Sequence, residues 1–315
     1  MTFYIDAFSS CTLRCPSCPV ANLSREDARP AKGLMTEALL RQILDKATRE
    51  AVVASVALFN WTEPLLHPRL AELVRVVKSY GLKCSISSHL NVMRGIDDLL
   101  SAGVDWFRVS LSGYRQEVYE RTHRGGEIEK VKANMAELAA AKRRTGATTD
   151  IEVFFHRYRG NLADELMMRR FAEDLGFRFS AAWAQVMPVE KILSYADPVQ
   201  PLVRLTDDDY ELIERLVLPL DEVLSLTAQR PVSTCPLQDD YMTLDVEGNA
   251  YLCCATSSRH SNRLASFLET PLSELQQMKR THPLCGPCMA KGLPLYLEHR
   301  LAEFDQIGYA LRPPS

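Results

Sequence analysis

The chain has 315 residues, enough for one large domain or for a domain of roughly 200 residues with an appended smaller one. Hydrophobic residues make up 46% and charged residues 24%, as in globular proteins with a buried core. The formal net charge of −3 gives no electrostatic reason to expect nucleic acid or an anionic membrane as a partner.

The N-terminal residues contain no basic segment followed by an apolar one, and no apolar run reaches about 18 residues. We therefore expect a cytoplasmic protein without a membrane span. Nine cysteines would be unusual as disulfides in that reducing compartment, so they are better explained as ligands. They fall at positions 11, 15 and 18, at 84, and at 235, 253, 254, 285 and 288.

Three of these cysteines lie within eight residues, in the sequence Cys11-Thr12-Leu13-Arg14-Cys15-Pro16-Ser17-Cys18. A short loop with this spacing can direct three sulfurs onto one inorganic centre, and thiolates suit zinc or an iron–sulfur cluster. Zinc usually takes a fourth Cys or His ligand, and none follows closely in the chain. Three ligands to a four-iron cluster would leave one iron open to a small chelating molecule.

Strand-like and helix-like segments alternate about six times over the first 190 residues. Helical periodicity is found at 36–47, 70–80, 96–102, 128–142 and 162–175, and strand-like runs at 3–8, 52–59, 83–87, 106–111, 150–155 and 177–186. The alternation predicts an α/β fold with a parallel sheet, in which the apolar run 52–59 is a strand buried on both faces. Six units are fewer than the eight of a closed barrel, and the sequence lacks a GxGxxG dinucleotide motif.

The pattern changes between residues 197 and 231. Asp207, Asp208 and Asp209 can cap a helix that continues to about Val217, and a short helical segment follows at 221–226. Farther on, residues 242–246 and 250–254 predict a β-hairpin around a turn at 247–249. The expected divisions are therefore a core domain at 1–196, a helical bridge at 197–231 and a C-terminal domain at 232–315.

A second group of four cysteines spans 54 residues of this C-terminal part: Cys235, Cys253, Cys285 and Cys288. The predicted hairpin brings the chain back toward Cys235, and the last two cysteines form a CxxC motif. From the residues alone, a four-cysteine zinc site is the natural interpretation. Cys84 is expected in the core. Cys254 is left over, and it points away from Cys253 if 250–254 is a strand.

The three-cysteine motif and the strand-like residues before it resemble the radical S-adenosylmethionine (SAM) enzymes. The resemblance implies a [4Fe–4S] cluster on Cys11, Cys15 and Cys18, whose fourth iron binds the amino and carboxylate groups of SAM. It also implies a partial (β/α)6 TIM-type barrel with its ligands at the carboxyl ends of the strands. An external electron donor such as flavodoxin or ferredoxin is expected to reduce the cluster.

Several segments at the predicted strand ends resemble SAM-binding motifs of this family. Residues 60–64 stand where the family usually carries Gly-Gly-Glu-Pro, but Trp61 and Thr62 replace the two glycines. Glu63 would be the partner of the SAM amino group, and the guanidinium of Arg124 could hold its carboxylate through a bidentate pair. The expected SAM-binding residues are Asn60, Thr62, Glu63, Ser110 and Arg124.

The C-terminal cysteines resemble a SPASM domain in its shortened twitch form. The resemblance implies one auxiliary [4Fe–4S] cluster, ligated by Cys235, Cys253, Cys285 and Cys288, in place of zinc. The pattern is most similar to members of aminoglycoside biosynthesis, namely 2-deoxy-scyllo-inosamine dehydrogenase and neomycin-type epimerases. A small sugar or aminocyclitol is therefore the expected substrate.

This resemblance implies removal of a hydrogen atom from a carbinol carbon of the substrate. We favour epimerisation, with the Cys254 thiol returning a hydrogen atom to the opposite face. The alternative is oxidation to a ketone through the auxiliary cluster. A peptide-modifying SPASM enzyme is less expected because only ten residues precede Cys11, too few for a leader-binding domain. A non-catalytic zinc protein is the remaining alternative.

Overall fold

The computed structural model describes residues 1–21, 33–257 and 260–311. In these residues, nine strands form one sheet in the order β6-β5-β4-β3-β2-β1-β7-β8-β9. The strands are β1 (Thr2–Ile5), β2 (Ser55–Ala57), β3 (Lys83–Ser88), β4 (Trp106–Leu111), β5 (Asp150–Arg157), β6 (Arg178–Trp183), β7 (Tyr241–Leu244), β8 (Asn249–Tyr251) and β9 (Arg263–Ser266). Neighbouring strands from β6 to β1 are parallel, as is the β1–β7 pair, whereas β7, β8 and β9 are antiparallel.

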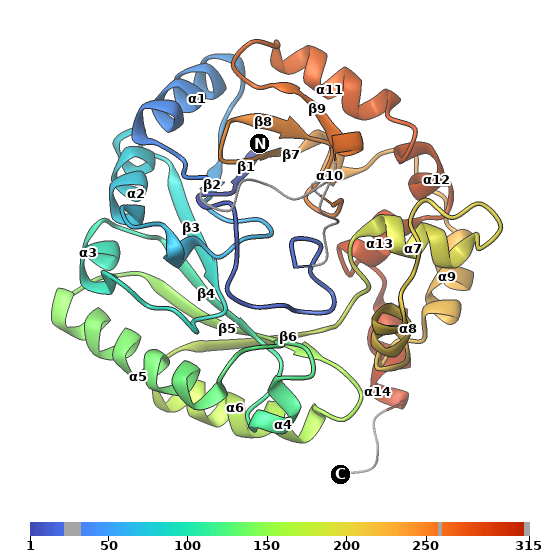
Figure 1. Ribbon diagram of the computed structural model, residues 1–315, viewed down its shortest axis with the longest axis horizontal. Coiled ribbons are helices and arrows are strands. Elements are labelled where there is room, and N and C mark those ends of the chain that lie inside the picture. The colour runs from blue at the N-terminus through green and yellow to red at the C-terminus, as the bar shows by residue number, and fades with distance from the viewer. Residues whose placement is uncertain (22–32, 258–259, 312–315) are drawn as a thin grey trace.

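Helices connect the parallel strands and cover the outer face of the curved sheet (Figure 1). They are α1 (Glu37–Glu50), α2 (Leu70–Ser79), α3 (Ile96–Ser101), α4 (Gln116–Tyr119), α5 (Ile128–Thr145) and α6 (Leu162–Asp174), with a short 3-10 helix, η1 (Pro64–Leu66), after β2. The expected α/β fold, a partial barrel built from six parallel strands, is confirmed.

Strand alternation gives the sheet an apolar outer face and a more polar inner face. On β4, Phe107, Val109 and Leu111 are fully buried in the core beneath the helices. The alternate residues Arg108 and Ser110 line a cavity on the inner side of the curve. The site therefore lies inside the curve of the sheet.

Several predicted strands are longer than the observed ones, and two of them differ most in what they imply. The apolar run 52–59 contributes only Ser55–Ala57 to β2, and Val52 is 88% exposed. The predicted strand 250–254 ends as β8 at Tyr251, so Cys253 and Cys254 lie in the turn beyond it. The alternation of a strand therefore does not explain the orientation of these two cysteines.

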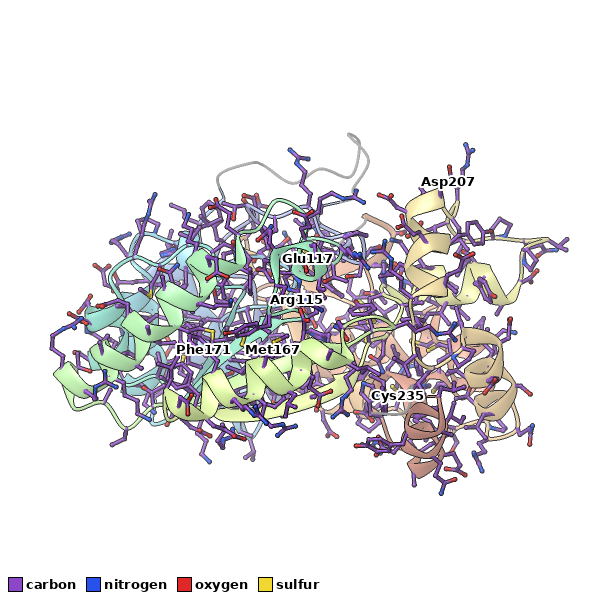
Figure 2. All side chains as sticks on the ribbon, turned by 90° about the horizontal axis from the view of Figure 1, so that it is seen from below. Arg115, Glu117, Met167, Phe171, Asp207 and Cys235 are labelled. Carbon is purple, nitrogen blue, oxygen red and sulfur yellow. The ribbon has the colours of Figure 1, made fainter. Side chains whose placement is uncertain are left out.

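The C-terminal part is mainly helical. Its elements are α7 (Val189–Ala196), α8 (Asp207–Glu214), α9 (Leu220–Ala228), α10 (Pro236–Asp239), η2 (His260–Asn262), α11 (Leu272–Thr281), α12 (Cys285–Ala290), α13 (Leu293–Leu297) and α14 (Ala302–Ala310). As expected, the acidic run begins α8, where Thr206 and Asp209 form a capping box. Asp207 lies at the outer end of this helix (Figure 2).

The sheet and the cores cross the domain boundaries expected from the sequence. The first core contains the barrel residues together with Met242, Leu244 and Leu275 from the C-terminal part. The second core joins α7, α8 and α9 to α13 and α14. The division into 1–196, 197–231 and 232–315 stays a prediction. Among the described helices, none has both the length and the apolar character needed to cross a membrane.

Gly292 joins α12 to α13 in a conformation that excludes other residues. Its φ is +62°, and a Cβ atom there would overlap the backbone carbonyls of Thr227, in the last turn of α9, and Arg230, just after that helix. We predict that Gly292→Ala lowers the free energy of unfolding by about 1–3 kcal/mol or more in urea denaturation. Gly160→Ala is the matched control, because its φ is also positive (+85°) but a Cβ would meet no atom within 4 Å. An equal loss in both variants would contradict the steric explanation.

Candidate active site

A cavity of about 460 Å³ lies inside the curve of the sheet. Its lining comes from the inner face and carboxyl ends of the parallel strands and from the C-terminal part, including Cys254, Leu297 and His299. The loop that follows β1 runs through the centre of the ring of helices (Figure 1). This position brings the three-cysteine motif together with groups from distant parts of the chain.

Cys11, Cys15 and Cys18 all line this cavity. Their loop is held by backbone hydrogen bonds, from Cys18 N to Cys15 O (3.0 Å) and from Arg14 N to Arg124 O (2.9 Å). Burial raises the pKa of all three thiols, that of Cys11 to about 12, so a metal would have to displace their protons. Three soft ligands on one loop beside a cavity fit an iron–sulfur cluster with one open iron.

Asp6, at the end of β1, fixes the segment expected to bind SAM. Its buried Oδ1 accepts hydrogen bonds from Asn60 N (3.1 Å), Trp61 N (3.1 Å) and Thr62 Oγ1 (2.8 Å). One carboxylate oxygen therefore sets the conformation of three successive residues that lack the usual glycines. We did not predict Asp6 from the sequence, although its place after a short strand and on the same face as Tyr4 was a usable signal.

Glu63 lies at the cavity with its carboxylate already held by protein groups. Oε1 accepts from Leu65 N (3.0 Å) and caps η1, while Oε2 accepts from His89 N (3.1 Å). The same Oε2 lies 3.1 Å from His89 Nε2. The carboxylate is therefore rigidly oriented, with its side chain 1% exposed.

Two neutral histidines line the cavity. Ser110 Oγ lies 3.1 Å from His156 Nε2, and Ser112 Oγ lies 3.0 Å from His123 Nδ1. Burial lowers the pKa of both His123 and His156 to about 3. Near neutral pH both rings are uncharged and can donate one hydrogen bond and accept another. Neither histidine was predicted as a site residue: His156 lies within β5, and His123 lies after α4, next to the predicted Arg124.

The structure brings four of the five expected SAM-binding residues to the cavity. Asn60, Thr62, Glu63 and Ser110 line it, whereas Arg124 does not. The Arg124 side chain is 51% exposed and forms a bidentate pair with Asp208, at 2.8 and 3.3 Å. Its contribution to the cavity is indirect, through the backbone carbonyl that holds the cysteine loop. A direct contact between Arg124 and SAM stays a prediction and would require the Asp208 pair to open.

The four C-terminal cysteines expected to hold a second cluster line a separate, much smaller cavity of about 30 Å³. Cys235 precedes α10, Cys285 and Cys288 lie on α12, and Cys253 follows β8. Figure 2 shows Cys235 among the C-terminal helices, away from α5 and α6. Most of the remaining lining is apolar, so the cavity offers mainly sulfur as a ligand. The donor set fits a cluster ligated entirely by protein.

Lys279 on α11 supports the wall of this small cavity. Its buried ammonium donates to the backbone carbonyls of Leu237 (3.1 Å) and Tyr241 (2.6 Å), which flank the segment after Cys235. The same charge lies near the sulfurs of Cys253 and Cys285. A cation at this place favours negatively charged sulfur ligands.

Cys253 and Cys254 are neighbours in the chain but line different cavities. Cys253 lines the small one with three other cysteines, and Cys254 lines the large one with Cys11, Cys15 and Cys18. A hydrogen bond between the neighbouring thiols raises the pKa of Cys254 and lowers that of Cys253. Cys254 therefore faces the large cavity and is not among the four cysteines that line the small one. Cys84 is fully buried in the first core, as its sequence context suggested.

All nine cysteines have free thiols. Within the described residues, no group of three or more His, Cys, Asp and Glu side chains is arranged to hold a single metal ion. The two cysteine groups are therefore defined by the cavities that they line.

The comparisons with known proteins bear on the barrel and on the overall fold. The model of the radical SAM superfamily matches residues 7–159. GTP 3′,8-cyclase of Chlorobaculum tepidum is 28% identical over 139 residues, which are 42% of this chain and 39% of that protein. The chain thus spans about two-fifths of the length of this curated relative.

Two solved structures share the fold over most of the chain. SuiB of Streptococcus suis, bound to its precursor peptide SuiA, is 17% identical with a TM-score of 0.57, over 90% of this chain and 65% of that one. BtrN in complex with AdoMet and 2-DOIA is 14% identical with a TM-score of 0.54, over 93% of this chain and 87% of that one. At these identities the similarity shows the fold alone. The family model thus covers the part of the chain that contains the three-cysteine loop, and the solved structures extend the similarity of fold to the C-terminal part.

Proposed function

We propose that the protein removes a hydrogen atom from a carbinol carbon of a small hydroxylated substrate and inverts that carbon. The observation that carries the proposal is the position of Cys254, which shares the large cavity with Cys11, Cys15 and Cys18. When bound, the [4Fe–4S] cluster and SAM supply the 5′-deoxyadenosyl radical that abstracts the hydrogen atom. A cavity of about 460 Å³ suits a small substrate beside SAM better than a folded partner.

The residues of the cavity have separate roles in this proposal. Cys11, Cys15 and Cys18 would hold the SAM-binding cluster. Asn60, Thr62, Glu63 and Ser110 would orient SAM, in a loop whose conformation Asp6 sets. Cys235, Cys253, Cys285 and Cys288 would hold an auxiliary cluster behind Cys254.

Cys254 supplies the second hydrogen atom. Its S–H bond breaks, the hydrogen atom goes to the face of the substrate radical opposite the abstraction, and a sulfur-centred radical remains on Cys254. One electron and one proton then restore the thiol. An external low-potential electron donor of the flavodoxin or ferredoxin type would supply this electron and the one needed to cleave SAM.

A second candidate function is oxidation of the carbinol to a ketone. The observation in its favour is the four-cysteine cavity next to Cys254, because a cluster there could accept the electron that the deprotonated substrate radical loses.

Product mass in deuterated water separates the two reactions. We expect an inverted product that carries one solvent deuterium, because the Cys254 thiol exchanges its hydrogen with water. A product lighter by two hydrogens would instead establish the dehydrogenase. The assay uses anaerobically reconstituted protein, SAM, a chemical reductant and a series of sugars and cyclitols.

Glu63→Ala tests the placement of SAM. We expect weaker SAM binding, because the variant removes a charge-assisted contact to the SAM amino group worth about 1.5–3 kcal/mol. Both clusters should remain, since Glu63 contacts no cysteine ligand directly in the hydrogen-bond network. Glu72→Ala, an exposed carboxylate on α2, is the control. If calorimetry gives the same SAM affinity for Glu63→Ala as for the wild type, the assignment of residues 60–64 is wrong.

A further inference from the structure

Arg108 places a positive charge inside the large cavity. It lies on β4, two residues before Ser110, and lines the same cavity as Cys254. Its Nε donates to Ser87 Oγ at 3.0 Å. Over the part of the chain that the structure describes, no carboxylate forms an ion pair with its guanidinium.

Aromatic rings surround this guanidinium. Its central carbon lies 5.3 Å from the ring centroids of Phe59 and Trp106 and 5.1 Å from that of Phe154. Such contacts stabilise a cation but do not neutralise it. Burial lowers the pKa of Arg108, which shows that the charged form has lost favourable hydration. A bound anion would restore the missing partner.

The other ionisable groups near Arg108 do not provide that partner. Glu152, its neighbour on β5, stabilises the charge of Arg108 electrostatically, but its ion pair is with Arg178, at 3.4 Å. Glu63 is held by hydrogen bonds from Leu65 N in η1 and from His89 N. His123 and His156 are neutral because burial lowers their pKa to about 3.

Arg108 and the proposed hydrogen donor Cys254 line the same cavity and have a neighbour in common. Both Arg108 and Cys254 interact electrostatically with Tyr4, whose side chain lines the same cavity. Burial raises the pKa of Tyr4 to about 12, so this phenol is neutral and can donate a hydrogen bond. A ligand bound by Arg108 would therefore lie beside Tyr4 and Cys254.

We propose that Arg108 binds an acidic group of the substrate, a carboxylate or a phosphate, and thereby orients the reacting carbon toward Cys254. A guanidinium can hold either group through two parallel hydrogen bonds. An ammonium group would be repelled at this position, so the substrate is an acidic hydroxylated compound and not the aminocyclitol expected from the sequence. The inference rests on the proposed function for the reaction, but binding can be tested without turnover.

The test is calorimetric titration of the cluster-loaded, SAM-bound protein with matched sugars. Glucuronate, glucose and glucosamine share a ring and differ in charge, while glucose 6-phosphate and inorganic phosphate test the phosphate. We expect at least one acidic probe to bind about tenfold or more tightly than glucose, and glucosamine to bind most weakly, as a charge-assisted hydrogen bond predicts. Arg108→Met should abolish the preference and Arg108→Lys should retain part of it.

Two controls separate this role from others. Arg144→Met removes an exposed arginine on α5, paired with Asp97, and should leave all probe affinities unchanged. SAM affinity is measured in parallel, because the SAM carboxylate is a second possible partner for Arg108. If Arg108→Met does not fold, the comparison of Arg108→Lys with the wild type still tests the bidentate contact.

Several outcomes would overturn the proposal. The proposal is wrong if no acidic probe binds, or if acidic and neutral probes bind with equal affinity. It is also wrong if Arg108→Met still binds acidic probes more tightly than neutral ones. Loss of SAM affinity without a change in probe preference would assign Arg108 to the SAM carboxylate instead. A charge preference in a protein that forms no 5′-deoxyadenosine would disprove the proposed function and leave the anion site intact.

Discussion

Replacing Cys11, Cys15 and Cys18 together with alanine is expected to abolish SAM cleavage and to halve the iron content. Wild-type protein reconstituted without oxygen should carry about eight irons and eight sulfides, from two four-iron clusters. The variant should retain about four of each, because Cys235, Cys253, Cys285 and Cys288 line a separate cavity. Iron and sulfide analysis, with chromatography for 5′-deoxyadenosine, measures both effects.

Cys84→Ala is the matched control for this experiment. Cys84 is fully buried in the first core and lines neither cysteine cavity, so its loss should leave the iron content and SAM cleavage unchanged. A triple variant that still cleaves SAM would disprove the assignment of the three-cysteine loop. Wild-type protein that binds zinc without sulfide would favour the non-catalytic zinc protein.

Cys254→Ala is expected to retain both clusters and SAM cleavage but to lose the inverted product. The physical reason is that Cys254 lines the cavity with the three-cysteine loop, while its neighbour Cys253 faces the other cysteine group. Without a thiol, the substrate radical lacks a hydrogen donor and should give only side products. Mass spectrometry of the product and solvent deuterium incorporation report the loss.

Cys253→Ala should behave differently, which makes the adjacent cysteine the natural control. We expect it to lose about four irons, because it removes one ligand of the auxiliary site. If Cys254→Ala instead turns over normally to a product lighter by two hydrogens, the enzyme is a dehydrogenase. Cys254 would then be a packing residue between the two cavities.

The barrel was predictable because local patterns determine it. The apolar strands and the helical periodicity between them gave the order of elements, and the three-cysteine spacing stood out within eight residues. Glu63 and Ser110 were expected at the carboxyl ends of two parallel strands, which meet at the same edge of a sheet. Both residues do line the cavity.

The remaining features depend on contacts between distant segments. The parallel pairing of β7 with β1 joins residues 239 positions apart in the register Thr2 to Tyr241, and no local pattern specifies it. Arg108 could have been found by counting two residues back from Ser110, but its missing counter-ion is visible only in three dimensions. Arg124 shows the reverse case, because a motif predicts a SAM contact while the side chain pairs with Asp208 in the structure, so the contact stays a prediction.

The central claim is that this chain performs radical SAM chemistry, and formation of 5′-deoxyadenosine tests it most directly. Anaerobically reconstituted wild-type protein is incubated with SAM and dithionite, and the nucleoside products are separated and quantified. The account predicts 5′-deoxyadenosine and methionine in equal amounts, at a rate that rises when an acidic hydroxylated substrate is added. Intact SAM after prolonged incubation of protein that carries both clusters would contradict it.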